Sequence, residues 1–436
     1  MRQLVITLEF QQRHDNPSPF SPKLLLRLTS DMKMDTDILI VGGGVSGSAM
    51  GAALVNSGHR VICIDQGTGG PLDTARGDHI SPANVEVLAE WGVLEDFFAA
   101  GATKRIGHQF KSSEGETLLS GEYAEMGAPY PYFLVINHEL ITPTFMNFAQ
   151  TDPNFVLLRP YSVKDLEVTD GNVTNVLATN REGDEIQISA RMVIACDGAS
   201  STVREKLRVP CFEHPYKHPI VILFADRPVG LLPENYFLRY AGDNGQLFVL
   251  QRMDGTVKIT LAVGEEGIPW WKKSTNEERQ KIVGSIAPEL ADCELEVSGF
   301  YPVRMIHAIE YAIGNVVLIG DAAHAIHPAR GQGLNMGIAS LKTLLPLIPS
   351  PEEIGNPEAV KLALAEFQRI QKPLNERIIA RNHSAAMEME MGADENRAFV
   401  LKKSNAAIKA MAEDPRIRKL HLNEATGYHF GVPAKA

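Results

Sequence analysis

Residues 37–47 read DILIVGGGVSG, and this stretch decides the fold. Its first five residues, Asp37 followed by four apolar residues, predict a short buried β-strand. Glycines then stand at positions 42, 44 and 47, the spacing G-x-G-x-x-G, and the following segment SAMGAALVNSG predicts a helix. A second apolar run, RVICID, ends at Asp65, 18 residues after Gly47. A strand, a glycine turn, a helix, a strand and a terminal acid, in that order, predict a dinucleotide site.

Each glycine of this turn has its own physical reason. Gly42 permits a tight turn, Gly44 lets the backbone approach a pyrophosphate, and Gly47 lets the helix pack closely on the strand. The helix that begins near Val45 and Ser46 directs free N–H groups and the positive end of its dipole at phosphates. Farther on, Asp65 and the adjoining Gln66 lie where adenosine ribose hydroxyls would bind. Both FAD and NAD(P) fit this unit.

Two later stretches repeat the pattern of an apolar strand that ends in an acid and a glycine. The first is RMVIACDG at 191–198, which continues into ASSTVREKL, and the second is NVVLIGDAAHAIHPARGQGLNMG at 315–337. Such strands predict one parallel sheet with its carboxyl ends at a common edge. A nicotinamide dehydrogenase needs no second motif of this kind, so the extra motifs favour FAD.

Together, over about residues 35–385, the three motifs resemble the single-component FAD-dependent monooxygenases that hydroxylate aromatic rings, the para-hydroxybenzoate hydroxylase family. The runs YPVRMIHAIEYAIGNVVLIGDAAH and HPARGQGLNMG look most like the ubiquinone-biosynthesis and alkylquinolone-pathway hydroxylases. The resemblance implies an α/β fold: a Rossmann-like, GR2-type FAD-binding domain with a mostly parallel sheet, an inserted antiparallel-sheet substrate domain and C-terminal helices. It also implies FAD as cofactor, NADH or NADPH as co-substrate, and oxygen transfer from O2 to a small aromatic substrate through a flavin C4a-hydroperoxide.

The resemblance assigns cofactor contacts to all three motifs. Asp321 would bind hydroxyls of the flavin chain, while Leu334 and Asn335, at the start of a helix, would direct backbone N–H groups at the flavin ring. Arg76 matches a family arginine, and Asn137 stands where the family often has Arg or Gln. The expected cofactor-binding set is Gly42, Gly44, Val45, Ser46, Gly47, Asp65, Gln66, Arg76, Asn137, Asp197, Gly320, Asp321, Gly331, Gly333, Leu334 and Asn335.

The catalytic side chains are less determined by the sequence. Alternating runs such as VILFAD, GQLFVLQRM and TVKITLAV predict an antiparallel sheet with one buried face, which in the family covers the flavin ring. From these strands and the third motif we select Tyr236, Arg239, Tyr301 and Pro328 as catalytic candidates. A hydrophobic, bicyclic or alkylated aromatic substrate is what the resemblance favours.

The spacing of the motifs also predicts the domain organisation. The chain leaves and re-enters one FAD-binding domain, residues 35–103, 136–207 and 306–350. Residues 104–135 and 208–305 then form the substrate domain, and residues 351–436 a C-terminal helical segment. Residues 1–34 are expected to be a disordered leader, because QQRHDNPSPFSPK is polar and contains prolines.

Composition excludes several classes of protein. Lys and Arg total 42 against 53 Asp and Glu, a net charge of −11, which would repel nucleic acid. No run approaches the ~18 apolar residues of a membrane-spanning helix, and the four scattered cysteines have no metal-ligand spacing. We therefore expect a metal-free, cytoplasmic monomer or homodimer that binds no nucleic acid.

Three alternatives share much of this pattern. A flavin-dependent halogenase would carry W-x-W-x-I-P, which the sequence lacks; its paired tryptophans are Trp270 and Trp271 in GIPWWKK. A flavin-dependent reductase of isoprenoid double bonds has the same domain plan, and a non-catalytic flavoprotein would bind FAD or a ligand without turnover. An oxygenated aromatic product would separate a monooxygenase from all three.

Overall fold

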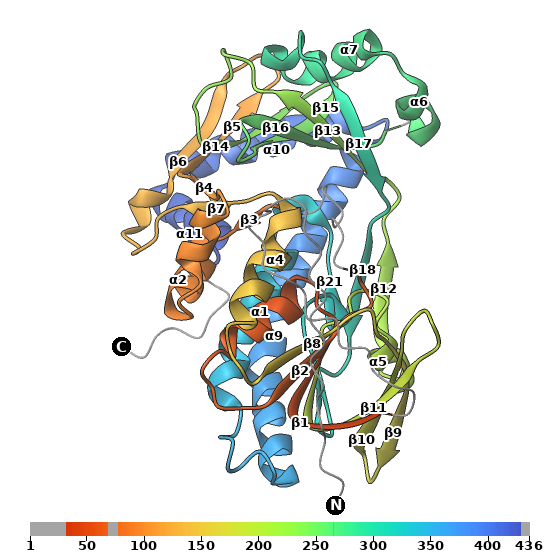
Figure 1. Ribbon diagram of the computed structural model, residues 1–436. Coiled ribbons are helices and arrows are strands. Elements are labelled where there is room, and N and C mark those ends of the chain that lie inside the picture. The colour runs from red at the N-terminus through yellow and green to blue at the C-terminus, as the bar shows by residue number, and fades with distance from the viewer. Residues whose placement is uncertain (1–31, 69–76, 265, 429–436) are drawn as a thin grey trace, which may run out of the picture.

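The computed structural model describes residues 32–68, 77–264 and 266–428. Figure 1 shows two bodies, a lower one built on a parallel sheet and an upper one built on a second sheet, joined by long strands and a long helix. Residues 1–31 of the expected leader and the candidate Arg76 lie outside the described residues. The last three residues of that leader, 32–34, were wrongly expected to be disordered, because they begin strand β1 and pair in parallel with β11.

The lower body contains a sheet in which five strands run parallel, in the order β20-β11-β1-β2-β8. These strands come from chain segments far apart in sequence, and their carboxyl ends share one edge. The predicted mostly parallel sheet is therefore confirmed; β9, β10 and β19 extend it with antiparallel pairs. Its strands are β1 (Met32–Val41), β2 (Val61–Ile64), β8 (Phe155–Leu158), β9 (Ser162–Thr169), β10 (Asn172–Thr179), β11 (Glu185–Ala195), β19 (Ala312–Ile313) and β20 (Val316–Leu318).

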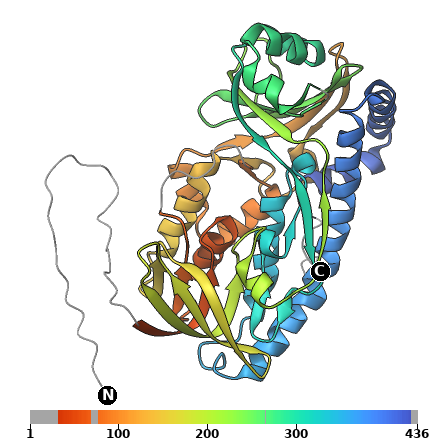
Figure 2. The same ribbon diagram turned by 90° about the vertical axis from the view of Figure 1, so that its right-hand side faces the viewer.

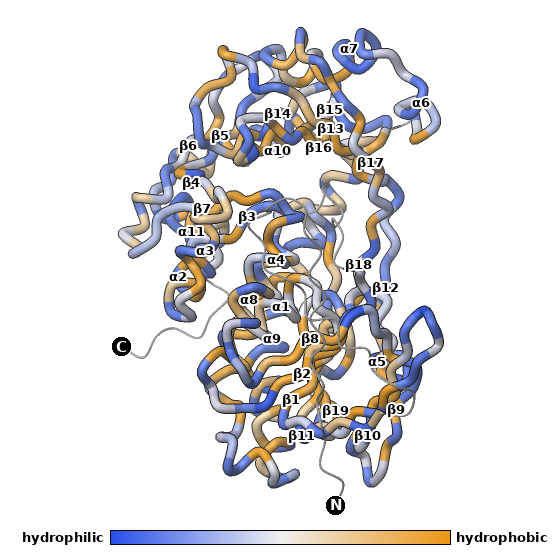
Figure 3. The backbone as a smooth tube through the Cα atoms, in the orientation of Figure 1, coloured by the Kyte–Doolittle hydropathy of each residue, from blue (hydrophilic) through white to orange (hydrophobic). Residues whose placement is uncertain are grey.

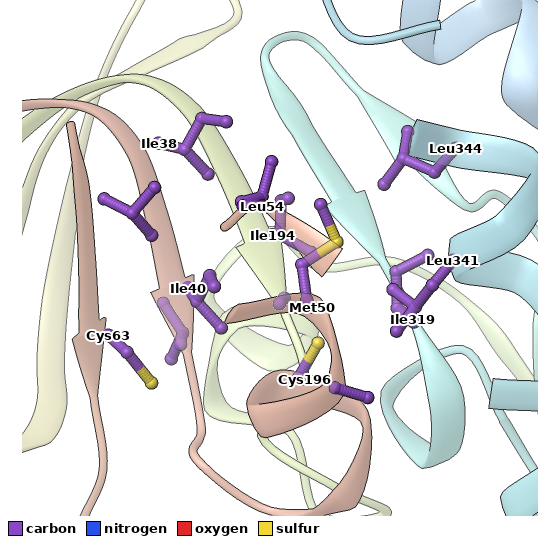
Figure 4. Packing of buried hydrophobic residues seen from close by; sticks show 14 of the residues in the cluster. Ile38, Ile40, Met50, Leu54, Cys63, Ile194, Cys196, Ile319, Leu341 and Leu344 are labelled. Carbon is purple, nitrogen blue, oxygen red and sulfur yellow. The ribbon is translucent and has the colours of Figure 1, made fainter. Parts of the chain in front are cut away.

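The parallel sheet is buried on both faces. Consecutive residues 38–40 of β1 are completely buried although they point to alternate faces, as expected where helices cover a sheet on both sides. Figure 4 shows Met50 of helix α1 and Leu341 of helix α8 packing among apolar residues that include Ile194 of β11. Figure 3 shows the same strands as a hydrophobic band. The covering helices include α1 (Val45–Ala53), α4 (His138–Ala149), α5 (Thr202–Lys206) and α8 (Gly333–Leu344).

The upper body is a seven-stranded sheet in the order β17-β13-β16-β15-β14-β5-β6. Most neighbours are antiparallel, as expected, but β5 and β14 pair in parallel, with Gly107 opposite Tyr236. The two strands can run parallel because they lie far apart in the sequence and are not joined by a hairpin. The strands are β5 (Gly107–Ser112), β6 (Thr117–Glu122), β13 (Ile220–Asp226), β14 (Tyr236–Gly242), β15 (Gly245–Gln251), β16 (Thr256–Ala262) and β17 (Glu296–Tyr301).

The two faces of this upper sheet differ in exposure. The outer face packs under α6 (Gly267–Lys273) and α7 (Asn276–Ile286), and its side chains, such as Leu223 and Ile259, are completely buried. The inner face turns toward the lower body, and several of its large residues, among them Phe248 and Tyr301, are only half-buried. The inner face is therefore the accessible one.

Two small sheets connect the bodies. One has the order β3-β7-β4 and lies beside helices α2 and α3, and the other has the order β12-β18-β21 and runs between the bodies in Figure 1. Their elements are β3 (His79–Ile80), β4 (Thr103–Arg105), β7 (Phe133–Val135), β12 (Cys211–Pro215), β18 (Arg304–Ala308), β21 (His324–Ala325), α2 (Pro82–Glu90) and α3 (Leu94–Ala99).

The C-terminal helices pack on both bodies. The helix α9 (Pro357–Met391) begins on the parallel-sheet core, where Phe367 is buried, and ends beside the upper sheet, where Met389 is buried. Figure 2 shows it running along the lower body as far as the upper sheet. The helix α10 (Arg397–Glu413) then lies against β6, β14 and β15, and α11 (Pro415–Ala425) turns back toward η1 (Tyr123–Met126).

Candidate functional site

The glycine turn after β1 has the geometry that its sequence predicts. Gly42 has a φ of +95°, and a Cβ on Gly47 would lie 1.8 Å from the Gly42 carbonyl oxygen, so helix α1 must pack directly on the turn. A Cβ on Gly44 would meet nothing within 4 Å. Helix α1 has no side-chain cap and no acidic residue in its first turn. Its N–H groups are therefore available to an anion.

The three motifs meet through close backbone contacts. A Cβ on Gly42 would lie 2.6 Å from the Cys196 carbonyl oxygen in the second motif, and a Cβ on Gly320 would lie 2.3 Å from Oγ of Ser46. Gly320 also has a φ of +61°. Gly42, Cys196 and Gly320 thus bring three distant segments together at one edge of the parallel sheet.

Asp65 stands beside this edge but is already engaged. Its Oδ2 accepts a hydrogen bond of 2.7 Å from Nε of Arg159, which follows β8, and both side chains are partly buried. A Cβ on Gly43 would lie 3.0 Å from the Asp65 Cβ, which shows how near this carboxylate is to the glycine turn. Arg159 fixes the carboxylate there, and Gln66, the next residue, is exposed.

The second motif forms a hydrogen-bonded unit within the chain. Asp197 accepts from the Ser201 hydroxyl at 2.6 Å and from the Val203 N–H at 3.1 Å. The buried Arg204 guanidinium donates to the Ala322 carbonyl oxygen at 2.8 Å, which ties this motif to the third. The spacing D-G-x-x-S-x-x-R therefore builds a hydrogen-bonded support at the edge of the parallel sheet.

The third motif supplies a short loop and a second helix start. Asp321, in η3 (Gly320–Ala322), is partly exposed at the same edge. Gly331, which follows η4 (Pro328–Arg330), has a φ of +60°, and a Cβ there would lie 2.5 Å from Nε2 of His79. Gly333 and Leu334, the first residues of α8, are accessible, and this helix lacks a side-chain cap.

The side chain of Asn335 has a structural task. Its Oδ1 accepts from the Ser81 N–H at 2.7 Å and from Nδ2 of Asn84 at 3.0 Å, and the residue is 2% exposed. This anchors α8 to α2, so only the Asn335 backbone is suited to a flavin contact. Asn137, which precedes α4, donates from Nδ2 to Asp254 at 3.4 Å, while its buried Oδ1 has no hydrogen-bond partner among the described residues.

The inner face of the upper sheet lies over η4. Tyr301 and Phe248 of this face belong to one apolar cluster with Ala329 of η4 and Met389 of α9. Pro328 is exposed next to Ala329. The structure thus places the candidate Tyr301 in the same apolar cluster as the residue that follows the candidate Pro328.

Tyr236 and Arg239 are not brought to that cluster. Tyr236 packs with the outer-face core, and its hydroxyl donates to Glu122 at 2.9 Å; burial raises its pKa to about 12. Arg239 is on the inner face but is covered by α10, where it donates to Ser404 and Asn405 at 3.2 and 3.1 Å. Burial lowers its pKa to about 10. Both side chains have partners that explain them without a substrate.

A buried ion pair that the sequence motifs do not indicate joins the two bodies. Nζ of Lys258, on the inner face of β16, lies 2.6 Å from Oδ2 of Asp78, and both residues are almost completely buried. The Lys258 ammonium holds the pKa of the Asp78 carboxyl well below its usual range. Asp78 is next to His79, whose ring touches the backbone at Gly331, so the pair lies close to η4. A lone lysine in an alternating strand gave no sign of this role.

The accessible residues of the first and third motifs fit a dinucleotide with a flavin ring. Bound FAD would be held by the Gly44 turn, the Asp65 carboxylate, Asp321 and the start of α8. Within residues 32–68, 77–264 and 266–428 no helix is both long and apolar enough to cross a bilayer. In the same ranges no group of three or more His, Cys, Asp or Glu side chains could hold a metal.

Comparisons with known proteins agree with this geometry. The 6-methylpretetramide 4-monooxygenase of Streptomyces rimosus is 25% identical over 325 residues, covering 72% of this chain and 75% of that protein. A ubiquinone hydroxylase of Rhodospirillum rubrum is 24% identical over 378 residues, covering 83% and 82%. The crystal structure of p-nitrophenol 4-monooxygenase from Pseudomonas putida superposes with a TM-score of 0.76 at 20% identity, covering 92% of this chain and 100% of that one.

These matches confirm the expectation of an FAD-dependent monooxygenase, an oxidoreductase of the class that the three motifs resemble. The family model for the FAD binding domain matches residues 35–347, from the strand before the glycine turn to the end of α8 and η5. The chain therefore belongs to the FAD binding domain family.

Proposed function

We propose that the protein uses NADH or NADPH and O2 to hydroxylate, or epoxidise, an electron-rich and largely hydrophobic aromatic or quinolone-like molecule. One observation carries this proposal. The half-buried aromatic residues Phe248 and Tyr301 of the inner face share one apolar cluster with Ala329 of η4, beside the predicted flavin position. A planar apolar substrate that stacks there would be held against the flavin edge.

The chain's own residues would bind, orient and exclude water. When bound, FAD would supply the redox chemistry that activates dioxygen. The starts of α1 and α8 would hold its negative groups through backbone N–H groups. Met389 and Ala329 would close the apolar region against water, and Tyr301 would help to fix the plane of the substrate. The roles of these residues are part of the proposal.

The test is turnover by the FAD-loaded enzyme. Oxidation of NADH and of NADPH is followed with and without a panel of hydroxylated naphthalenes and quinolones, under 18O2. We expect one aromatic to stimulate oxidation and to gain one labelled oxygen atom. Reduction of a prenyl double bond without label would indicate the reductase alternative, and a halide-dependent halogenated product would indicate the halogenase. Flavin reduction that never gives an oxygenated product would refute the proposal.

A matched pair of variants tests the site. Tyr301→Phe keeps the ring and should preserve most of the coupling between NAD(P)H oxidation and product, whereas Tyr301→Ala removes the ring from the inner face. We expect the alanine variant to raise KM for the aromatic about tenfold, since a buried aromatic contact contributes roughly 0.5–1.5 kcal/mol beyond its area. Equal KM values for the two variants would remove Tyr301 from the site.

A further inference from the structure

Arg105 is a buried cation with unused hydrogen-bonding capacity. It ends β4 and is 4% exposed. The guanidinium carbon lies 4.3 Å from the ring centroid of Phe133 and 5.7 Å from that of Phe237, so the group is bordered by two aromatic rings. Its Nε is buried and has no hydrogen-bond partner in the part of the chain that the structure describes. The Arg105 guanidinium contacts the neutral hydroxyl of Tyr123.

No ion pair within the described part of the chain includes Arg105. Two other largely buried cations between the bodies are compensated. Lys258 pairs with Asp78, and Arg252 lies within 4.0 Å of carboxylates in Asp254 and Glu139.

Arg239 is the informative comparison, since it is equally buried and also lacks a carboxylate. Its guanidinium donates to Gln246, Ser404 and Asn405, so α10 and β15 satisfy it from inside the chain. Among the described residues Arg105 has no such set of acceptors, and the Tyr123 hydroxyl is its one polar contact that the structure shows. A buried charge with few hydrogen-bond acceptors destabilises the folded protein, and buried charges are therefore usually paired or hydrogen-bonded.

Arg105 lies close to the predicted flavin position. It is opposite Phe133 in the β4–β7 ladder, the His79 ring lies edge-on to Phe133 at 5.6 Å, and His79 touches the backbone at Gly331. Burial lowers the pKa of His79, which favours its neutral form. Arg105 is therefore two side chains away from the loop that would lie against the flavin.

An aromatic wall connects Arg105 to the apolar region over η4. Phe237, which borders the guanidinium, stacks on Phe248 with a centroid distance of 5.8 Å and an interplanar angle of 16°. Phe248 belongs to the same cluster as Tyr301 and Ala329. A planar molecule on this wall would have its apolar part at η4 and its far end at Arg105.

We propose that the aromatic substrate carries a carboxylate and that Arg105 binds it, so the site selects amphipathic aromatic acids. The planar guanidinium suits this task, because it stacks on rings and donates two parallel hydrogen bonds to a carboxylate. The inference deepens the proposed function and rests on it for the identity of the site. It assigns the far end of the substrate, where no reacting atom lies, to Arg105 as a specificity-determining residue.

The test compares two probes that differ in charge, 6-hydroxy-2-naphthoate and 6-hydroxy-2-naphthamide. Their affinities for the FAD-loaded protein are measured by isothermal titration calorimetry and by the shift of the flavin absorbance, without NAD(P)H. Binding is thus scored separately from turnover, so a failed proposed function and a failed Arg105 assignment give different results. We expect the acid to bind about tenfold more tightly, or more, than the amide.

Variants locate the effect. In Arg105→Gln the ratio of affinities should fall to about one, and in Arg105→Lys, which keeps the charge but not the paired geometry, it should be intermediate. Lys104→Gln is the matched control. Lys104 is the exposed neighbour in β4, lies over the Tyr132 ring at 4.5 Å, and should leave the ratio unchanged.

Several results would overturn the assignment. These are an acid that binds no better than the amide, the absence of binding by both probes, or a wild-type ratio that persists in Arg105→Gln. If Arg105→Gln loses FAD or fails to fold, Arg105→Lys decides, and a ratio equal to that of the wild type would then refute the proposal.

Discussion

Two glycines of the same turn should respond to alanine in opposite ways. At Gly47 the new Cβ would lie 1.8 Å from the Gly42 carbonyl oxygen, far inside the 3.0 Å limit of real contacts. Helix α1 would have to move by more than 1 Å, and we expect a loss of about 3 kcal/mol or more of unfolding free energy. At Gly44 a Cβ meets nothing within 4 Å, and φ −69° with ψ −164° is allowed for alanine. The apoprotein should therefore change by no more than about 0.5 kcal/mol.

Gly44→Ala should instead weaken FAD binding, although it leaves the stability of the apoprotein almost unchanged. Its methyl group would occupy the space through which the backbone approaches the pyrophosphate, and losing one charge-assisted hydrogen bond of about 1.5–3 kcal/mol weakens binding roughly 10- to 100-fold. Urea unfolding of the apoprotein gives the stability term, and fluorescence titration with FAD gives the affinity. Gly44→Ala with unchanged FAD affinity would refute the placement of the pyrophosphate. Gly47→Ala with unchanged stability would refute the packing argument.

Three further predictions concern stability. Arg204→Met removes the charged hydrogen bond to the Ala322 carbonyl, so urea unfolding should show a loss of about 3 kcal/mol; an unchanged midpoint would exclude the link between motifs. Asp78→Asn strands the buried Lys258 ammonium and should cost about 3–5 kcal/mol, whereas Asp78→Asn/Lys258→Met should recover more than half of that loss; simple additivity would contradict a coupled pair. Burial lowers the His421 pKa from 6.5 to about 4, so the unfolded chain binds a proton at a higher pH than the folded chain does. The stability that the neutral His421 ring contributes is therefore lost as the pH falls from 6.5 to 4. His421→Gln should flatten that slope by up to roughly 1.4 kcal/mol per pH unit, and an unchanged slope would count against a buried neutral ring.

Local chemistry explains what the sequence predicts well. The apolar run 37–41, the glycines after it and the acid at Asp65 act within one β-α-β unit, so their spacing is enough to place them. The second and third motifs repeat that logic, and their strands β11 and β20 join the same sheet. The partners of these motif residues were harder to foresee. Arg159, which holds Asp65, lies 94 positions away in sequence.

Strand periodicity explains why two of the catalytic candidates cannot lie on the same face of the upper sheet. Tyr236 and Arg239 are three positions apart in β14, and side chains three apart in a strand point to opposite faces. At most one of the two side chains could therefore face the flavin. Periodicity also could not show that α10 would cover Arg239, because that contact brings together residues more than 160 positions apart.

The burial of the outer face of the upper sheet explains why its inner face can remain accessible. A sheet needs apolar burial to fold, and here the outer face provides it, since Leu223, Ile259 and Trp271 of one core are completely buried. The inner face can then leave Phe248 and Tyr301 half-buried without unfolding the sheet. Apolar area that remains accessible in the folded protein is available for a ligand, whose binding would bury it. The same division explains why Arg105, at the end of the aromatic wall, can leave its Nε without an acceptor among the described residues: under our proposal that acceptor arrives with the molecule that covers the wall.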